Sequence, residues 1–173
     1  MSFDNIKIYS YSADDPWLSS PSTLGFASMP VNTSKIEYIK IKGVNLTNNL
    51  TITSLNAPFS TTITSITKEE AMAEGGFNIP VTFAPSSKGI FNTKLNITSN
   101  DFTSPIEIEI LAIAYGTEEV ANISELRTKW TGTVDQTTRY KITGESLVSF
   151  AIDNNYYIQD NQSGLLVYDI KPN

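Results

Sequence analysis

Two residue types that carry much of enzyme chemistry are missing from this chain of 173 residues, which contains no cysteine and no histidine. Their absence excludes disulfides, thiolate nucleophiles, zinc sites of the usual Cys/His kind and every histidine-based catalytic triad. We therefore expect a protein that is not an enzyme, with no catalytic residues, no cofactor and no metal site. The lack of cysteine leaves the compartment open, because a secreted β-sandwich can be stable without disulfides.

Positive charge and long apolar runs are also scarce. Twelve basic residues are scattered among eighteen acidic ones, and the net charge is −6. Because binding to nucleic acid draws on Lys and Arg that neutralise phosphates, we expect no nucleic-acid partner. No run approaches the ~20 apolar residues that a membrane helix needs, so we expect no membrane insertion. The opening segment, residues 1–10, has no basic stretch followed by an apolar core, so it shows no signal peptide.

What the chain does contain is a series of short segments in which apolar and polar residues alternate. Every odd position of 77–83 is large and apolar, and isoleucines alternate with glutamates over 106–110. Alternation gives a strand one buried and one wet face, as antiparallel sheets require. We predict an all-β domain, an antiparallel sandwich of about seven strands, over residues 1–116. Its predicted core consists of Phe77, Ile79, Val81, Phe83, Phe91, Leu95, Ile97, Ile106, Ile108 and Ile110.

Two short helical turns are predicted between the strands. Thr67 to Glu70 has the spacing of a capping box, and Asn122 to Glu125 has the same spacing ahead of residues 126–130. A polar, acidic stretch at 115–119 predicts the boundary between the sandwich and a second domain, residues 117–173.

The second domain is predicted to be a partial β unit that follows its short N-terminal helix. We expect one long strand from about Tyr140 to Ile152, then a hairpin with arms at 156–159 and 165–168. If Gly144 keeps the alternation, one face of the long strand carries Tyr140, Ile142, Val148, Phe150 and Ile152. So few strands are thin for independent stability. We therefore expect the unit to need a partner: the first domain, a symmetry mate in a homo-oligomer or larger assembly, or further chain.

Three stretches of the first domain resemble a known family. They are Ile39–Thr47, Val81–Gly89 and Leu95–Asp101. Together they resemble the immunoglobulin-like repeats of the choice-of-anchor and ASH-like type, which occur in bacterial surface and secreted proteins. The resemblance covers about residues 20–115. It implies an immunoglobulin-like β-sandwich in which the motif is structural, and it carries over no catalytic residue.

The second domain resembles the first half of an OB-like domain that follows such repeats in secreted or surface proteins of Bacteroidetes-type bacteria. The residues that carry this resemblance are Ile123–Arg127, Tyr140–Glu145, Tyr156–Asp160 and Gly164–Asp169. Relatives of this kind are often attached to larger secreted enzymes, including nucleases. The resemblance stops about halfway through the domain, so it implies no function of the later strands.

Candidate ligand residues lie in and beside the predicted hairpin. Asp160 and Asn161, with the acidic and amide groups of 153–155, supply oxygens that calcium could use, but turn chemistry accounts for them better. Tyr157 is the better surface candidate of the tyrosine pair, because neighbours in a strand face opposite sides. We predict that Trp130 packs in a core or interface. Tyr157, Asp160 and Asn161 are therefore the candidate ligand-binding residues.

Paired carboxylates at Glu107 and Glu109 are the remaining catalytic pattern, and their alternation with isoleucines favours a solvated strand face. The leading hypothesis is thus a non-catalytic β module of an extracellular or cell-surface protein, for spacing, adhesion or binding of a glycan or protein partner. The alternative is a virion protein, such as a head or tail fibre or decoration protein of a phage that infects such bacteria; an initial Met1 without a signal peptide favours it. Accessory domains of a secreted hydrolase are a weaker alternative.

Overall fold

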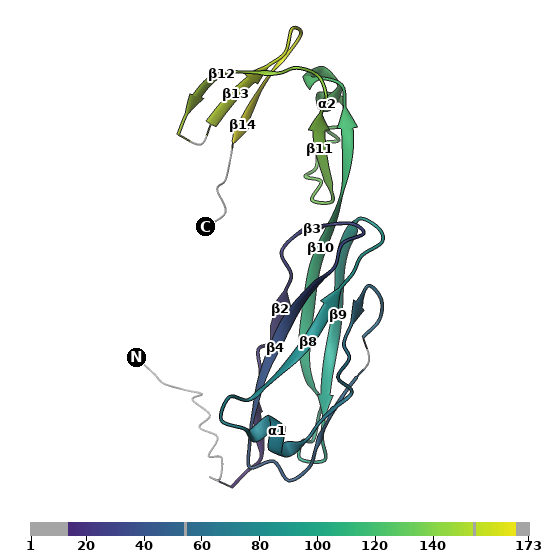
Figure 1. Ribbon diagram of the computed structural model, residues 1–173, viewed down its shortest axis with the longest axis vertical. Coiled ribbons are helices and arrows are strands. Elements are labelled where there is room, and N and C mark those ends of the chain that lie inside the picture. Colours follow the sequence, from purple (N-terminus) through teal and green to yellow (C-terminus); the bar gives the residue numbers. More distant parts are fainter. Residues whose placement is uncertain (1–13, 54, 154, 169–173) are drawn as a thin grey trace, which may run out of the picture. The chain divides into compact units, whose positions relative to one another are not determined.

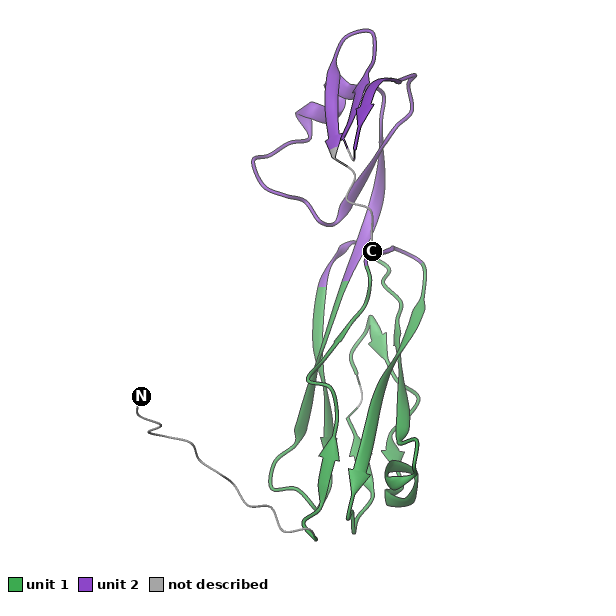
Figure 2. Cartoon of the chain, turned by 90° about the vertical axis from the view of Figure 1, so that its left-hand side faces the viewer, with its two compact units in different colours: residues 1–27, 33–86, 91–112 green, residues 28–32, 87–90, 113–173 purple. Residues whose placement is uncertain are grey.

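The computed structural model describes residues 14–53, 55–153 and 155–168, and the predicted lack of a signal peptide concerns residues outside these ranges. The chain forms two compact units, coloured separately in Figure 2. Unit 1 comprises residues 1–27, 33–86 and 91–112, and unit 2 comprises residues 28–32, 87–90 and 113–173. The predicted domains have a similar division, but the structure changes units after residue 112 rather than 116 and assigns two short earlier segments to unit 2.

Unit 1 is built as an immunoglobulin-like β-sandwich (Figure 1). Its strands are β1 (Trp17–Ser19), β2 (Thr23–Gly25), β4 (Lys35–Val44), β5 (Leu50–Ile52), β6 (Phe59–Ser60), β7 (Ser65–Ile66), β8 (Phe77–Phe83), β9 (Gly89–Thr98) and the first half of β10 (Ile106–Val120). One sheet has the order β1–β4–β8–β6. The other has the order β10–β9–β5–β7, with β2 also paired to β10. These elements confirm the predicted all-β class.

The alternation of the sequence becomes the two faces of these sheets. In the antiparallel pair of β4 and β8, Ile39 lies opposite Ile79, and both side chains are completely buried. The next pair, Lys40 and Asn78, points to the other side and is exposed. Cross-strand partners share a face, so one register places Ile39, Ile41, Ile79, Val81 and Phe83 together on the core side.

Most of the predicted core is confirmed. Seven of the ten residues are buried: Ile79, Val81, Phe83, Leu95, Ile97, Ile108 and Ile110. The other three, Phe77, Phe91 and Ile106, are half-buried. Phe77 and Ile106 begin their strands, where fewer neighbours cover a side chain. The centre of the core is Phe83, whose ring lies 4.9 Å from that of Phe59 and 5.6 Å from that of Phe91, centroid to centroid.

Both predicted helices are present, as α1 (Lys68–Met72) and α2 (Ile123–Thr128). The Thr67 hydroxyl accepts from the Glu70 amide at 3.2 Å, and the Glu70 carboxylate accepts from the Thr67 amide at 2.9 Å. This reciprocal pair is the capping box that the sequence predicts. At the second helix, Asn122 Oδ1 accepts from the Glu125 amide at 2.8 Å. No helix in the described part of the chain is long and apolar enough to cross a membrane.

A strand occupies the stretch where the sequence predicts a polar linker. β10 continues to Val120, and its last five residues pair in parallel with β11 (Thr138–Ile142), with Gly116 opposite Thr138. β3 (Met29–Pro30) pairs with the same strand at residues 114 and 115. The prediction was wrong because Glu118 and Glu119 were taken as a solvated linker. They instead face lysines of unit 2, since Lys129 pairs with Glu118 and Lys141 with Glu119.

The predicted long strand from 140 to 152 is also wrong, because the structure divides it between two sheets. β11 ends at Ile142, and β12 (Leu147–Ile152) belongs to a separate sheet. The chain leaves β11 where the Gly144 amide donates to the Ala121 carbonyl at 3.0 Å. A Cβ at Gly144 would lie 2.4 Å from that oxygen, so only glycine permits this close approach.

The C-terminal hairpin forms as predicted. β13 (Asn155–Gln159) and β14 (Gly164–Tyr168) pair antiparallel with Gln159 opposite Gly164, and β12 pairs with the other side of β13. The result is a three-stranded antiparallel sheet, visible as β12, β13 and β14 in Figure 1.

Candidate functional site

Tyr157 lies at the centre of one face of the β12–β13–β14 sheet. The register places it opposite Phe150 on one side and Leu166 on the other. The rings of Phe150 and Tyr157 confirm the shared face, with centroids 5.7 Å apart. Leu147 and Ile152 lie on the same face by the same alternation. We call these side chains the hairpin face: Leu147, Phe150, Ile152, Tyr157 and Leu166.

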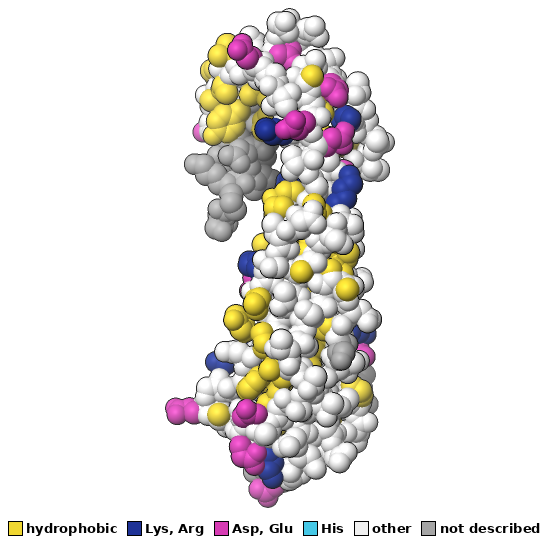
Figure 3. Space-filling view, turned by 45° about the vertical axis from the view of Figure 1, so that its right-hand side comes forward, with side chains coloured by type: hydrophobic (Ala, Val, Ile, Leu, Met, Phe, Trp, Pro, Cys, Tyr) yellow, Lys and Arg dark blue, Asp and Glu magenta, His cyan; other side chains and the backbone are white. Residues whose placement is uncertain are grey.

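The hairpin face is apolar and uncovered. All five side chains are exposed, with exposed fractions that run from 42% for Tyr157 to 63% for Leu147. Figure 3 shows hydrophobic side chains gathered over this part of unit 2. The other described members of the face are the uncharged Asn155, Gln159 and Gly164. A described face without any charge is notable in a chain of net charge −6.

The opposite face of the same sheet is better covered on β13 and β14, although Val148 and Ala151 of β12 are exposed there. Tyr156, Ile158, Leu165 and Val167 are half-buried. A bulge in β12 between Val148 and Phe150 shifts the alternation, so Val148 joins this second face. The sequence predicts an unbroken strand with Val148 on the face of Phe150 and Ile152, and this prediction is wrong. The bulge separates them, because one extra residue in a strand turns the following side chains to the other side.

Asp160, the second predicted ligand residue, is occupied by backbone amides. Its carboxylate accepts hydrogen bonds from the amides of Ile123, Gln162 and Ser163 at 2.7–2.8 Å. The Ile123 amide, first among these donors, holds the pKa of Asp160 below its usual value. The side chain thus organises the β13–β14 turn and caps the start of α2, as short acidic residues do in turns.

Asn161 lies beside Asp160 at the rim of a hollow of about 740 Å³, which Gly144, Glu145 and Asn122 also line. Asp153, the other acidic residue of the calcium hypothesis, adopts a left-handed φ of 53°. Asn154 lies outside the described residues. Among the residues that the structure describes, no group of three or more acidic side chains could hold a metal ion. Leu147 and Gln159 line the same hollow, so Asp160 and Asn161 border one edge of the hairpin face, whereas Tyr157 lies at its centre.

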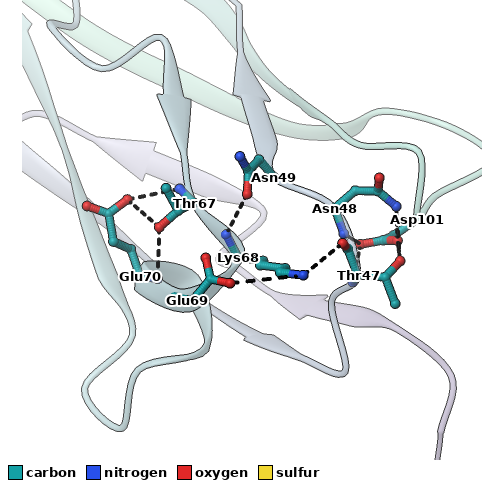
Figure 4. A network of polar contacts seen from close by, with 8 residues as sticks. All are labelled: Thr47, Asn48, Asn49, Thr67, Lys68, Glu69, Glu70 and Asp101. Carbon is teal, nitrogen blue, oxygen red and sulfur yellow. Dashed lines mark hydrogen bonds and ion pairs between the residues drawn. The ribbon is translucent and has the colours of Figure 1, made fainter.

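A dense polar network in unit 1 holds loops together, as Asp160 does in unit 2 (Figure 4). The Asp101 carboxylate accepts from the backbone amides of Thr47 and Asn48, both at 2.9 Å, and from their side chains. Burial opposes ionisation of this group, but the four hydrogen bonds outweigh it and hold the pKa of Asp101 well below its usual range. Lys68, at the start of α1, donates to the Thr47 carbonyl at 3.2 Å. The network fastens the β4–β5 loop to the β9–β10 turn.

The paired glutamates lie on an exposed strand face. Glu107 makes an ion pair with Lys94 at 2.6 Å, and Glu109 is exposed. This is the solvated strand face that the alternation favours. Of the two predicted positions for Trp130, a core or an interface, the core is wrong, because Trp130 is 65% exposed; the interface stays a prediction. An isolated Trp after a helix carries no signal in the sequence that distinguishes a buried side chain from an exposed one.

Comparisons with known proteins found solved structures of low sequence identity. No family model and no curated protein matches this chain. The ASH/PapD-like domain 7 of human CEP192 aligns with 68% of this chain and 99% of its own, at 11% identity and a TM-score of 0.49. A protein of unknown function from Porphyromonas gingivalis W83 aligns with 59% of this chain and 48% of its own, at 14% identity and a TM-score of 0.45. The sialic acid binding region of a Streptococcus sanguinis SK1 adhesin aligns with 91% of this chain and 47% of its own, at 11% identity and a TM-score of 0.35.

Proposed function

We propose that this chain is a non-catalytic binding and spacing module of a surface-displayed or secreted protein, and that it assembles with a second copy of itself through the hairpin face. The observation that carries the proposal is a group of five exposed apolar side chains on a sheet face that, among the described strand residues, carries no charged side chain. Exposed hydrophobic residues are ordinary when scattered, but a contiguous patch marks an interaction surface.

The size of the face fits a protein partner. At these exposed fractions, side chains of this kind leave roughly 100 Å² each in water. The hairpin face then offers on the order of 500 Å² of apolar surface, more than half of the roughly 800 Å² that each partner buries in a standard interface. A small ligand would leave most of that surface wet.

Charge favours a second copy as the occupant. Two molecules of net charge −6 repel each other, so their contact must lie where charge is absent. The hairpin face meets this condition in both copies at once. A twofold arrangement uses the same patch on both subunits, and Phe150 beside Tyr157 would then pack against the same pair in its twin. Two such sheets can pack face to face as in any sandwich.

We also propose where the module occurs, on the basis of the family resemblance of its sequence. A module of this type would space or display its neighbours on a bacterial surface or in a secreted protein. Self-assembly is equally what a virion fibre or decoration protein requires, so the virion alternative uses the same face. The OB-like resemblance of unit 2 stays a prediction, because an antiparallel three-stranded sheet is common to many β folds.

Sedimentation velocity over a concentration series tests the proposal directly. The wild-type chain should shift from monomer to dimer as its concentration rises, whereas Phe150→Lys should raise the dissociation constant at least about tenfold, because a buried unpaired charge is costly. Tyr38→Lys is the matched control, since Tyr38 is an aromatic residue in unit 1 with 59% exposure, close to the 57% of Phe150. It should leave the dimer intact.

Three outcomes would overturn the proposal. A wild-type chain that stays monomeric up to millimolar concentration excludes a second copy as the occupant. A dimer that Phe150→Lys leaves unchanged places the interface elsewhere. A dimer that Tyr38→Lys weakens equally would show that added charge, rather than the hairpin face, controls association.

A further inference from the structure

A second cavity of unit 2, separate from the hairpin face, lies around the segment that follows α2. Its volume is about 760 Å³, within the roughly 300–1,000 Å³ range of small-molecule sites. The residues that matter for its chemistry are Arg127, Lys129, Trp130, Asp135, Thr138 and Tyr140. We call it the Trp130 pocket. These six residues come from α2, from the segment after it and from β11.

The tryptophan of this pocket is available to a ligand. The Trp130 side chain is 65% exposed, although tryptophan is a residue that folded chains usually cover. Its backbone is fixed, because the Trp130 amide donates to the Arg127 carbonyl at 3.3 Å at the end of α2. Tyr140, from β11, is half-buried and lines the same cavity. The pocket therefore presents a flat, polarisable aromatic surface to solvent.

Polar groups around that surface are held in place. The Asp135 carboxylate accepts from the Thr137 amide and hydroxyl, both at 2.8 Å. The Thr138 hydroxyl, followed by Thr137, lowers the pKa of Asp135 to about 2, so the group remains an ionised acceptor at neutral pH. One nitrogen of the Arg127 guanidinium donates to the Gly164 carbonyl, and this bond holds the group beside the pocket. The guanidinium has five N–H donors, so others remain for a ligand.

The charges of the pocket balance, and this selects the class of ligand. Lys129 is paired with Glu118, and Lys88, which does not line the pocket, donates to the Thr138 hydroxyl at 2.7 Å. The lining then leaves the cation of Arg127 and the anion of Asp135 for a ligand. A site with one fixed donor group and one fixed acceptor group favours a neutral ligand rich in hydroxyl groups. It does not favour an acidic sugar or a nucleic acid, which would need an excess of positive charge.

We propose that the Trp130 pocket binds a neutral pyranose unit of a glycan. One C–H face of the sugar ring stacks on the indole, and its hydroxyl groups donate to Asp135 and accept from Arg127. Aromatic rings supply a large contact area of fixed geometry, and hydrogen bonds to charged groups are stronger than neutral ones. This site is independent of self-association, since none of its six named residues belongs to the hairpin face.

The chain offers a direct optical test because it contains only two tryptophans. In a Trp17→Phe background, Trp130 is the sole indole. We would titrate this protein with maltotriose, cellotriose, chitotriose and β-1,4-galactotriose, following indole fluorescence and saturation-transfer NMR of the sugar protons. 3′-Sialyllactose serves as the acidic probe, and a proline-rich peptide as a non-sugar probe. We expect at least one neutral trisaccharide to shift the fluorescence and to receive saturation at ring C–H protons of one face.

Variants separate the roles in the site. Trp130→Ala in the wild-type background should weaken the NMR-detected binding at least tenfold, and Asp135→Asn should weaken it several-fold. Trp17→Ala is the matched control, because Trp17 is 49% exposed in unit 1, and it should leave binding unchanged. Amide spectra of each variant establish that unit 2 is folded.

Each opposite result overturns the inference. Sugar at roughly 10 mM would nearly saturate a site with a dissociation constant of about 1 mM. If no neutral trisaccharide binds at that concentration, the pocket is not a glycan site. Binding that survives Trp130→Ala places the sugar elsewhere. A response to 3′-sialyllactose alone, or to the peptide alone, contradicts the neutral-sugar assignment. Because dimerisation is measured separately by sedimentation, loss of sugar binding and failure of self-association are distinguishable.

Discussion

The carboxylate of Asp160 accepts a hydrogen bond from the backbone amide of Ile123, a residue 37 positions earlier, at 2.8 Å. The bond joins the turn between β13 and β14 to the first residue of α2. One carboxylate therefore serves the hairpin that carries Tyr157 and the helix that leads to Trp130. This arrangement places Asp160 beside the hairpin face, in the hollow that Leu147 also lines, and bonds it to the helix that precedes Trp130.

Replacement of Asp160 by Ala should loosen both elements that it joins. Three amides, those of Ile123, Gln162 and Ser163, lose their acceptor, so their hydrogen exchange should accelerate on the order of tenfold. Glu145→Ala is the control, because Glu145 is an exposed acidic residue nearby, and exchange of the same amides should stay as in the wild type. Unchanged exchange in Asp160→Ala would contradict the structural role.

Acid should act on unit 1 through Asp101. Its pKa is lower in the folded chain than the unfolded reference of 3.8, so its contribution to stability is complete above that value. The contribution is lost as pH falls below 3.8 toward the lower folded pKa. Urea denaturation from pH 7 to pH 2 should show that Asp101→Asn is less stable than the wild type at neutral pH, and that the difference narrows in acid.

The matched control for that series is Glu74→Gln, an exposed acidic residue of the same unit. Its difference from the wild type should be small, because the side chain is exposed. A difference between Asp101→Asn and the wild type that stays constant from pH 7 to pH 2 would show that the hydrogen bonds of Thr47 and Asn48 do not depend on the charge of Asp101.

The phenylalanine cluster should dominate the stability of unit 1. Phe83 is completely buried and contacts three other rings, so Phe83→Ala should lower the free energy of unfolding by about 3–5 kcal/mol. Ile36→Ala removes an apolar side chain of the same sheet that is 50% exposed, and should cost about 1 kcal/mol or less. Chemical denaturation measures both. Equal costs would mean that the cluster is not the centre of the core.

Gly144 should tolerate no side chain. In Gly144→Ala the new Cβ would lie 2.4 Å from the Ala121 carbonyl oxygen, which is backbone and cannot move aside without a shift of the chain. We expect a loss of about 1–3 kcal/mol in the free energy of unfolding, the usual cost of overpacking. Gly116→Ala is the matched control in unit 2, since its Cβ would meet only the Lys88 side chain, at 3.6 Å. Equal thermal midpoints for the two variants would argue against the close approach at Gly144.

Local patterns in the sequence were sufficient for much of the fold. The alternation over 77–83 and 106–110 predicts which residues form the core, because a strand repeats every two residues wherever one of its faces is buried. The capping box at Thr67 and the N-cap at Asn122 are likewise set within one helical turn, and the hairpin from Asn155 to Tyr168 is set by its loop. These features depend on neighbours a few positions apart in the chain.

Tertiary structure decided the rest, because it depends on partners that no local pattern names. The parallel pairing of Gly116 with Thr138 turned a predicted linker into strand, and the approach of Gly144 to Ala121 broke a predicted strand into two. The bulge in β12 moved Val148 away from Phe150. Exposure is the same kind of property: Trp130 and Phe150 are as hydrophobic in sequence as Phe83, and only the packing around each side chain determines that the first two face water while the third is buried.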